Sequence, residues 1–176
     1  MHAGLHRALL RTFARLPVGV RRRLVRTIAP SYTVGAMCFV ERSDGALLLV
    51  RHSYRRRWGV PGGLLERGEE PAVGAVREAA EETGVAVVLV GEPTPVVEPV
   101  PQRIDLVFRG RLAADCPPEA ARPCSAEIEE VGWFAPGELP ELQHETAQAM
   151  VALARRRSDV DPAGSRFDGD AVGGDR

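Results

Sequence analysis

The sequence of 176 residues contains no lysine and no asparagine, and all 23 of its basic residues are arginine. Such a uniform choice indicates codon preference rather than chemistry. Cysteine is also scarce: the chain has three, Cys38, Cys116 and Cys124, and no C-x-x-C pair. This odd set argues against a disulfide framework and against a zinc knuckle. We therefore expect three free thiols in a reducing compartment.

Long apolar runs are absent as well. The longest stretch without a charged residue covers 27–40, about 14 residues interrupted by Pro30 and Gly35, whereas a membrane-spanning helix needs about 20 apolar residues. The N-terminus shows no continuous apolar segment followed by a small-residue cleavage site, so we predict no secretory signal. Both absences predict a cytoplasmic protein.

Acidic residues are missing from the first 30 positions, which hold seven arginines. The remaining 146 residues carry 16 arginines against 24 acids, so their net charge is −8. In the basic segment, apolar residues recur at helical spacing on both sides of Pro17, which predicts two short amphipathic helices. The apolar stripe consists of Leu5, Leu9, Phe13, Leu16, Val20, Leu24 and Ile28.

Two interpretations of residues 1–30 are open. In the first, the apolar stripe packs on the rest of the molecule, and the arginines face solvent or pair with acids of the same chain or of a partner subunit. In the second, the basic face binds an anionic membrane surface or nucleic acid. The stripe is short and lacks an interfacial tryptophan, which favours the first interpretation.

From residue 31 onward, short apolar runs alternate with turns. Residues 32–40 and 46–50 predict a hairpin, because Ser43-Asp-Gly45 supplies a turn between them. Further elements are expected as strands at 85–90, 104–108 and 129–134, a proline-rich loop at 91–101, and helices at 71–83 and 138–156. Strands before and after one strong helix predict a mixed α/β fold. We divide the chain into the basic segment 1–30, a domain over 31–155, and a tail over 156–176 that we expect to be disordered.

The helix predicted at 71–83 has clear boundaries and two different faces. Pro71 suits the first helical position, and Gly84 suits a left-handed C-terminal cap. At about 100° per residue, three glutamates gather on one side of this helix. These are Glu78, Glu81 and Glu82, and the opposite side carries the expected core residues Ala72, Val73, Val76, Ala79, Ala80 and Thr83. Arg77 borders the acidic side and is spaced to pair with Glu81.

Three neighbouring carboxylates repel one another, and a divalent cation such as Mg²⁺ removes that repulsion. A plain solvated acidic face is the alternative explanation of such a cluster. The segment before the helix favours the cation, because Gly59, Gly62, Gly63 and Gly68 allow backbone groups to approach a ligand closely. A glycine-rich loop followed by an acidic helix predicts a site for phosphate and metal.

The same residues resemble the Nudix (MutT-like) hydrolase family. The Nudix box, G-x5-E-x7-R-E-U-x-E-E-x-G-U, is filled at each defining position. Its members here are Gly63, Glu69, Arg77, Glu78, Glu81, Glu82 and Gly84, with apolar Ala79 and Val85. The segments 58–63 and 133–140 are also similar to the family, so the resemblance spans roughly 32–145 and leaves out the basic N-terminus.

The resemblance implies an α/β/α sandwich with a mixed sheet, and hydrolysis of a nucleoside diphosphate linked to another moiety with Mg²⁺ or Mn²⁺. By position in the box, Glu78, Glu81 and Glu82 would ligate the metal together with the Gly63 carbonyl. Arg77 would orient this cluster by ion pairing, and Glu69 would support the loop or a second metal. A metal-bound water would attack phosphorus, and either a glutamate of the box or Glu127 on a later loop would take its proton.

The substrate stays open between a nucleotide sugar, ADP-ribose and a nucleoside triphosphate. The arginines just before the box are candidates for phosphate contacts, and the aromatic residues beside them for stacking on a base. The proposed substrate-binding residues are Arg51, Tyr54, Arg57 and Trp58, with Arg55 and Arg56 in the same run. We expect a small-molecule partner, no specific nucleic acid, and a homodimer as an option. The alternatives are a nucleotide-sensing Nudix module without turnover and a diphosphate hydrolase docked on a membrane surface.

Overall fold

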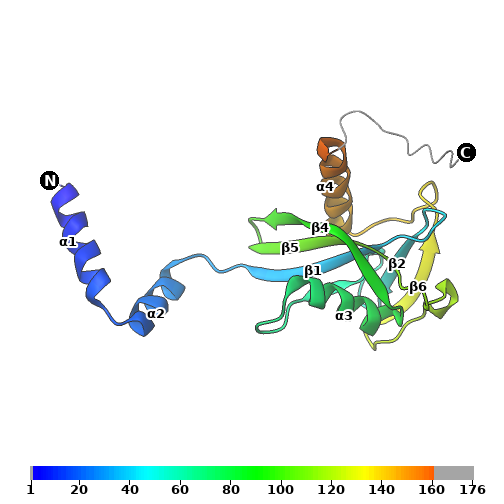
Figure 1. The fold of residues 1–176 in the computed structure, drawn as a ribbon, viewed down its shortest axis with the longest axis horizontal. Coiled ribbons are helices and arrows are strands. Elements are labelled where there is room, and N and C mark those ends of the chain that lie inside the picture. Colours follow the sequence, from blue (N-terminus) through cyan, green and yellow to red (C-terminus); the bar gives the residue numbers. More distant parts are fainter. Residues whose placement is uncertain (1, 161–176) are drawn as a thin grey trace, which may run out of the picture.

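The computed structural model describes residues 2–160. Two helices open the chain, α1 (His2–Arg15) and α2 (Val18–Ile28), and the break between them falls at Leu16 and Pro17. A short extended segment then leads into the first strand, so that both helices stand apart from the sheets (Figure 1).

The larger sheet has four strands in the order β3-β1-β5-β4. Strand β1 (Thr33–Val40) lies in the interior and pairs in parallel with β5 (Arg103–Leu112) and in antiparallel with β3 (Gly62–Leu64). The edge strand β4 (Val87–Glu98) pairs in antiparallel with β5. The sheet is therefore mixed, as expected.

A second sheet contains only β2 (Leu47–His52) and β6 (Ile128–Phe134), which run antiparallel. The predicted hairpin of 32–40 with 46–50 is wrong, although the turn at 43–45 is present. Only one isolated bridge, Glu41 to Leu47, joins the two segments. The first segment instead finds β5 as its partner, a strand that lies far along the sequence.

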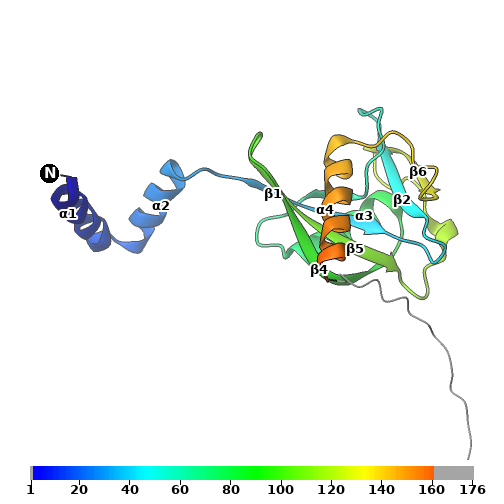
Figure 2. The same cartoon turned by 90° about the horizontal axis from the view of Figure 1, so that it is seen from above.

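Both faces of β1 are buried, and a different helix covers each face (Figures 1 and 2). Ala36, Cys38 and Val40 pack toward α3 (Pro71–Thr83), whereas Met37 and Phe39 pack with Ala149 of α4 (His144–Val160). Alternate residues of a strand point to opposite faces, which explains why this strand reads as a continuous apolar run. The α/β/α sandwich is confirmed.

Helix α3 has the predicted limits. It begins at Pro71, and Gly84 caps it with a left-handed φ of 73° while its N–H donates to the carbonyl of Ala80. Glycine adopts this conformation without a Cβ penalty, so the helix ends there and the chain turns toward β4.

Two other boundaries differ from expectation. Strand β4 continues through Pro93 and Pro95 to Glu98, where a proline-rich loop was predicted. Its position at the edge of the sheet, with a register shift between Val90 and Thr94, allows the prolines because their missing N–H groups are not needed. Helix α4 begins at His144 rather than at 138 and continues to Val160, so residues 156–160 of the predicted tail are helical. The rest of that tail, 161–176, lies outside the described residues.

The favoured interpretation of the basic segment is wrong in this structure. Among the described residues, α2 has none that is buried, and the apolar side chains of Val18, Val25 and Ile28 are exposed. Helices α3 and α4 already cover the two faces of the large sheet, which leaves the apolar residues of α2 without a partner in the domain. Within residues 2–160, no helix has both the length and the apolar character of a membrane span.

Candidate active site

The site is built where β3 meets the C-terminal half of α3. Gly62 and Gly63 pair with Met37 and Ala36 of β1, so the sheet fixes the backbone of both glycines. A Cβ atom placed on Gly63 would lie 2.4 Å from Oε1 of Glu78. Only glycine lets this carboxylate lie directly against the strand.

Arg77 binds three carboxylates at once. Its Nε donates to Glu69 Oε1 at 2.8 Å and its Nη2 donates to Glu69 Oε2 at 3.0 Å. Its Nη1 donates to Glu78 Oε1 at 2.9 Å and to Glu81 Oε2 at 3.0 Å. The guanidinium therefore ties the loop, through Glu69, to the acidic side of the helix.

These contacts change the acidity of the groups. The hydrogen bonds from Arg77, and then the one from the Glu66 backbone N–H, lower the pKa of Glu69 to about 2. Burial raises the pKa of Glu78 above its ordinary value; hydrogen bonds from Arg77 oppose this rise, and the charges of Glu82 and Glu81 add to it. Glu78 is thus a carboxylate whose ionised form lacks full compensation in the protein alone.

Glu82 is more buried than Glu78 and Glu81, with 7% of the residue exposed. It accepts a hydrogen bond from the Gly62 backbone N–H at 3.1 Å, and its other oxygen lies 3.5 Å from His52 Nε2. The buried side of α3 contains Gly74, Ala75, Ala79, Glu82 and Thr83. The expected core set is therefore partly wrong: Ala72, Val73 and Ala80 are exposed, because the helix is turned so that its acidic side meets β3.

The glutamates open into a cavity of about 780 Å³. It is lined mainly by polar and charged residues. These include residues that the sequence analysis named: Tyr54, Arg55, Gly62, Gly63, Arg77, Glu78, Glu81, Glu82 and Glu127. His52 Nδ1 and Ser125 Oγ are buried at this cavity and have no hydrogen-bond partner within residues 2–160. Buried polar atoms require partners, so these two atoms indicate a place for water or a polar ligand.

Glu127 and Tyr54 lie close to each other in the lining of the cavity. Partial burial, followed by the negative charge of Glu127, raises the pKa of the Tyr54 hydroxyl. Tyr54 as a whole residue remains 66% exposed, and the centroid of its ring lies 5.2 Å from that of His52. Both residues predicted on this side of the site thus lie in the cavity.

Three predicted substrate-binding residues do not line this cavity. Arg51 pairs with Glu129 and Glu130 across the small sheet, because its strand β2 is held by β6. Arg57 pairs with Glu141 at 2.6 Å. Trp58 packs edge-on against Phe134 in the core under α4, with ring centroids 4.8 Å apart.

Arg103, Gln143 and Glu145 also line the cavity, although the sequence analysis did not assign them to it, and Arg55, a predicted phosphate contact, lies there with them. Arg103 donates three hydrogen bonds to Asp105, at 2.7–3.0 Å, and Asp105 is 3% exposed. Arg55 donates to Gln143 and to Glu145, each at 3.1 Å. Gln143 directly precedes α4, and Glu145 lies in its first turn. No local motif marks these two residues or Arg103, because they reach the cavity only through the strand order and the packing of the helix.

The donor set fits a hard divalent cation. Glu78 and Glu82 approach the adjacent glycines Gly63 and Gly62, so two carboxylates, which are oxygen ligands of the kind such a cation prefers, converge at one edge of the cavity. Within the described residues, no three acidic, histidine or cysteine side chains already form a closed metal site. Arg77 and the Gly62 N–H hold the carboxylates in the protein alone.

These features define a class: an α/β/α sandwich with a loop–helix acid cluster facing a polar cavity. The sequence profile described as NUDIX domain matches residues 31–155. A MutT-like protein of Streptomyces ambofaciens is 37% identical over 120 residues, which cover 68% of this chain and 74% of that protein. A human diphosphoinositol polyphosphate phosphohydrolase 3-alpha is 52% identical over 50 residues, which cover 28% of this chain and 30% of that protein.

The fold agrees with these sequence matches. The crystal structure of a NUDIX hydrolase from Nitrosomonas europaea superposes with a TM-score of 0.61 and 25% identity, covering 74% of each chain. The chain belongs to the Nudix family. It is a hydrolase of the class that acts on phosphoric anhydrides.

Proposed function

We propose that this protein is a divalent-metal-dependent pyrophosphohydrolase that cleaves a nucleoside diphosphate linked to another moiety. The observation that carries the proposal is that the acidic side of α3 and two arginines, Arg55 and Arg103, face the same polar cavity. Hydrolysis of a diphosphate requires positively charged groups beside its oxygens and a carboxylate that can take a proton from the attacking water, and this cavity offers both.

Glu78, Glu81 and Glu82, with the Gly63 carbonyl, would hold Mg²⁺ or Mn²⁺. The cation, when bound, supplies charge that neutralises diphosphate oxygens and lowers the pKa of water in the site. Arg77 positions two of the three carboxylates, and its double hydrogen bond to Glu69 fixes the guanidinium itself. Glu69 therefore acts through Arg77 as a support of the cluster.

The proton of the attacking water needs an acceptor in the cavity. Glu127 lines the cavity, makes no ion pair among the described residues and interacts only with the Tyr54 hydroxyl there, so its carboxylate is one candidate. Glu82 is the other option, because Arg77 does not bind it. Glu127→Gln distinguishes the two: loss of turnover with metal binding intact assigns the base to Glu127, whereas unchanged turnover assigns it to Glu82.

The far wall would receive the substrate. Asp105 fixes Arg103, and Gln143 with Glu145 fixes Arg55, so both guanidinium groups are held in place before binding. Tyr54 offers an exposed ring on which a nucleobase can stack. A nucleoside triphosphate, a nucleotide sugar and ADP-ribose each contain the diphosphate and base that this arrangement fits.

The alternative is a nucleotide-sensing module without turnover. The complete Nudix box, with its carboxylates in the cavity, supports the enzyme instead. A panel of the three substrate classes with Mg²⁺ or Mn²⁺, read as release of nucleoside monophosphate, tests both. Tight nucleotide binding with no product from any class would establish the sensor.

Glu82→Gln should abolish turnover, because it removes one metal ligand and keeps the shape of the side chain. Glu70→Gln is the matched control: Glu70 precedes the same helix, is exposed, and makes no side-chain capping bond. Metal-dependent activity in Glu82→Gln equal to that of Glu70→Gln would contradict the proposed site.

A further inference from the structure

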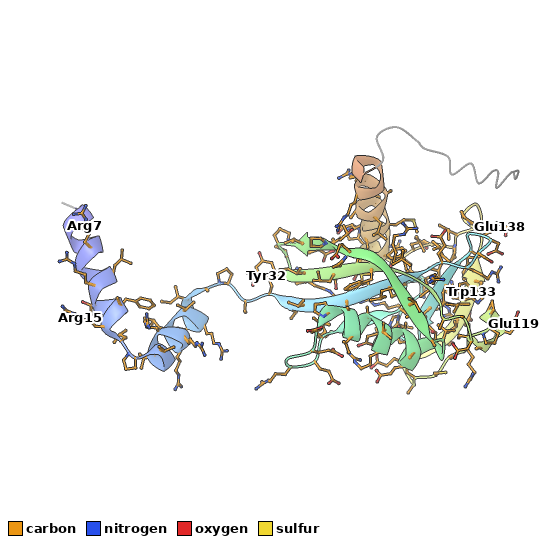
Figure 3. The ribbon with its side chains drawn as sticks, in the orientation of Figure 1. Arg7, Arg15, Tyr32, Glu119, Trp133 and Glu138 are labelled. Atoms are coloured by element: carbon orange, nitrogen blue, oxygen red, sulfur yellow. The ribbon has the colours of Figure 1, made fainter. Side chains whose placement is uncertain are left out.

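Helices α1 and α2 form a surface that the hydrolase site does not use. They stand apart from both sheets, and Figure 3 shows Arg7 and Arg15 on α1 at a distance from the domain. The segment 1–30 carries seven arginines and no acid, whereas the remaining residues sum to −8. An anionic surface would attract the helices and repel the rest of the molecule.

Helix α2 is divided lengthwise into an aliphatic and a basic side. At about 100° per residue, its five aliphatic residues span about 160° of the circumference, and Arg22, Arg23 and Arg26 occupy the other side. These aliphatic residues are Val18, Val20, Leu24, Val25 and Ile28, and all are exposed, Ile28 by 76%. Helices with this division lie flat in the interface between lipid headgroups and acyl chains.

The elbow between the helices combines both characters in one hollow. It is lined by the apolar side chains of Phe13, Val18 and Val25 together with Arg21, Arg22 and Arg26. Arg21 falls within the aliphatic side of α2, and its Nε is enclosed without a hydrogen-bond partner in the described chain. A guanidinium surrounded by aliphatic groups is suited to a phosphate located just above acyl chains.

Other partners satisfy only part of this surface. Nucleic acid would accept the arginines, but its phosphates offer nothing to five exposed aliphatic side chains on one helix side. A second copy of the segment would cover the aliphatic side, but it would bring fourteen arginines together without an acid, twice the seven of one chain. An anionic bilayer satisfies both the charge and the aliphatic side chains.

We propose that α1 and α2 bind the surface of an anionic phospholipid bilayer, with the aliphatic side of α2 among the lipids and the elbow arginines on lipid phosphates. Membrane attachment is separate from catalysis, because no residue of the elbow lines the hydrolase cavity.

Co-sedimentation of the full chain with vesicles tests this directly. The protein should pellet with phosphatidylcholine–phosphatidylglycerol vesicles, remain in solution with phosphatidylcholine alone, and be released at high salt. Each basic residue near an anionic leaflet raises the partition constant about fivefold, so Arg21→Gln/Arg22→Gln/Arg26→Gln should bind about 100-fold more weakly. Arg56→Gln/Arg111→Gln/Arg122→Gln removes the same charge from exposed positions of the domain and should bind almost as the parent chain does.

The aliphatic contribution has its own matched pair. Val18→Ser/Val25→Ser should weaken binding about tenfold, while Val73→Ser/Val151→Ser, at exposed helical valines of the domain, should not. Failure to pellet, equal binding to neutral vesicles, or full binding by the elbow triple variant would overturn the proposal. So would tighter binding to an RNA oligonucleotide than to the anionic vesicles, or a dimer by light scattering that Val18→Ser/Val25→Ser converts to monomer.

Discussion

Replacing Gly63 by alanine should remove activity while leaving the fold in place. The added Cβ would lie 2.4 Å from Glu78 Oε1, whereas ordinary contact begins at 3.4 Å, so the carboxylate must move by about 1 Å. The atoms that must move are the end of a flexible side chain. A displacement of about 1 Å in a catalytic group costs about 100-fold in rate, and we expect that loss in kcat with Mg²⁺.

The neighbouring glycine provides the contrast. A Cβ on Gly62 would lie 2.4 Å from the carbonyl oxygen of Ala36 and 2.9 Å from Cα of Met37, both backbone atoms of β1. These atoms cannot shift without breaking the β1–β3 pair, so Gly62→Ala should destabilise the fold by about 3 kcal/mol. Gly63→Ala should change the free energy of unfolding by no more than about 1 kcal/mol, since alanine is favoured over glycine in a strand.

The assay combines steady-state kinetics with thermal unfolding. Gly62→Ala should lower Tm by about 10 °C, Gly63→Ala by less than about 4 °C, and Gly137→Ala, with no atom within 4 Å of its added Cβ, by nothing measurable. Wild-type kcat in a folded Gly63→Ala variant would refute the position assigned to Glu78. Unfolding of that variant would show that the Glu78 side chain cannot yield.

Three further predictions concern other parts of the molecule. Arg103→Gln/Asp105→Asn removes both charges of a pair and so leaves no buried carboxylate alone. It should lower kcat/KM by about 10- to 100-fold with Tm nearly unchanged, whereas Arg109→Gln/Glu41→Gln, at an exposed pair, should leave kcat/KM unchanged. Glu69→Gln should be less stable than the parent chain at neutral pH, because the folded-state pKa of Glu69 is lowered from 4.5 to about 2. That difference is present above pH 4.5 and should vanish as the pH falls through about 2, so a constant gap in unfolding curves would contradict the Arg77 pairing. Iodoacetamide should alkylate exposed Cys124 in the folded protein but not Cys38, whose burial raises its pKa to about 12. Mass spectrometry of peptides from protein alkylated before unfolding measures this, and alkylated Cys38 would contradict it.

The helix and its loop were predictable because their signals are local. Pro71 and Gly84 mark the ends of α3, and the spacing of Glu78, Glu81 and Glu82 brings the carboxylates together on any regular helix. The orientation of that helix was not predictable from apolar residues alone. Alanine and valine satisfy either side, and the contact of Gly62 and Gly63 with Glu82 and Glu78 decides which side turns inward.

The far wall of the cavity depends on long-range pairing. Arg103 reaches the site because β5 pairs in parallel with β1, which sets Asp105 beside Gly35 and places both residues near the Gly63 carbonyl. Trp58 and Arg51 were predicted to bind substrate because they lie near the box in the sequence, but neither lines the cavity. Sequence distance is therefore a poor measure of membership in this site.

Arg77 has a consequence for the resting enzyme. With one guanidinium already bonded to Glu69, Glu78 and Glu81, the cluster keeps a counter-charge of its own when no cation is present. Under the proposed function, an arriving ion would compete with this internal arginine for two carboxylates, which would lower its affinity and ease its departure after each turnover. The strength of ion binding and the speed of release would then depend on a residue that need never touch the ion.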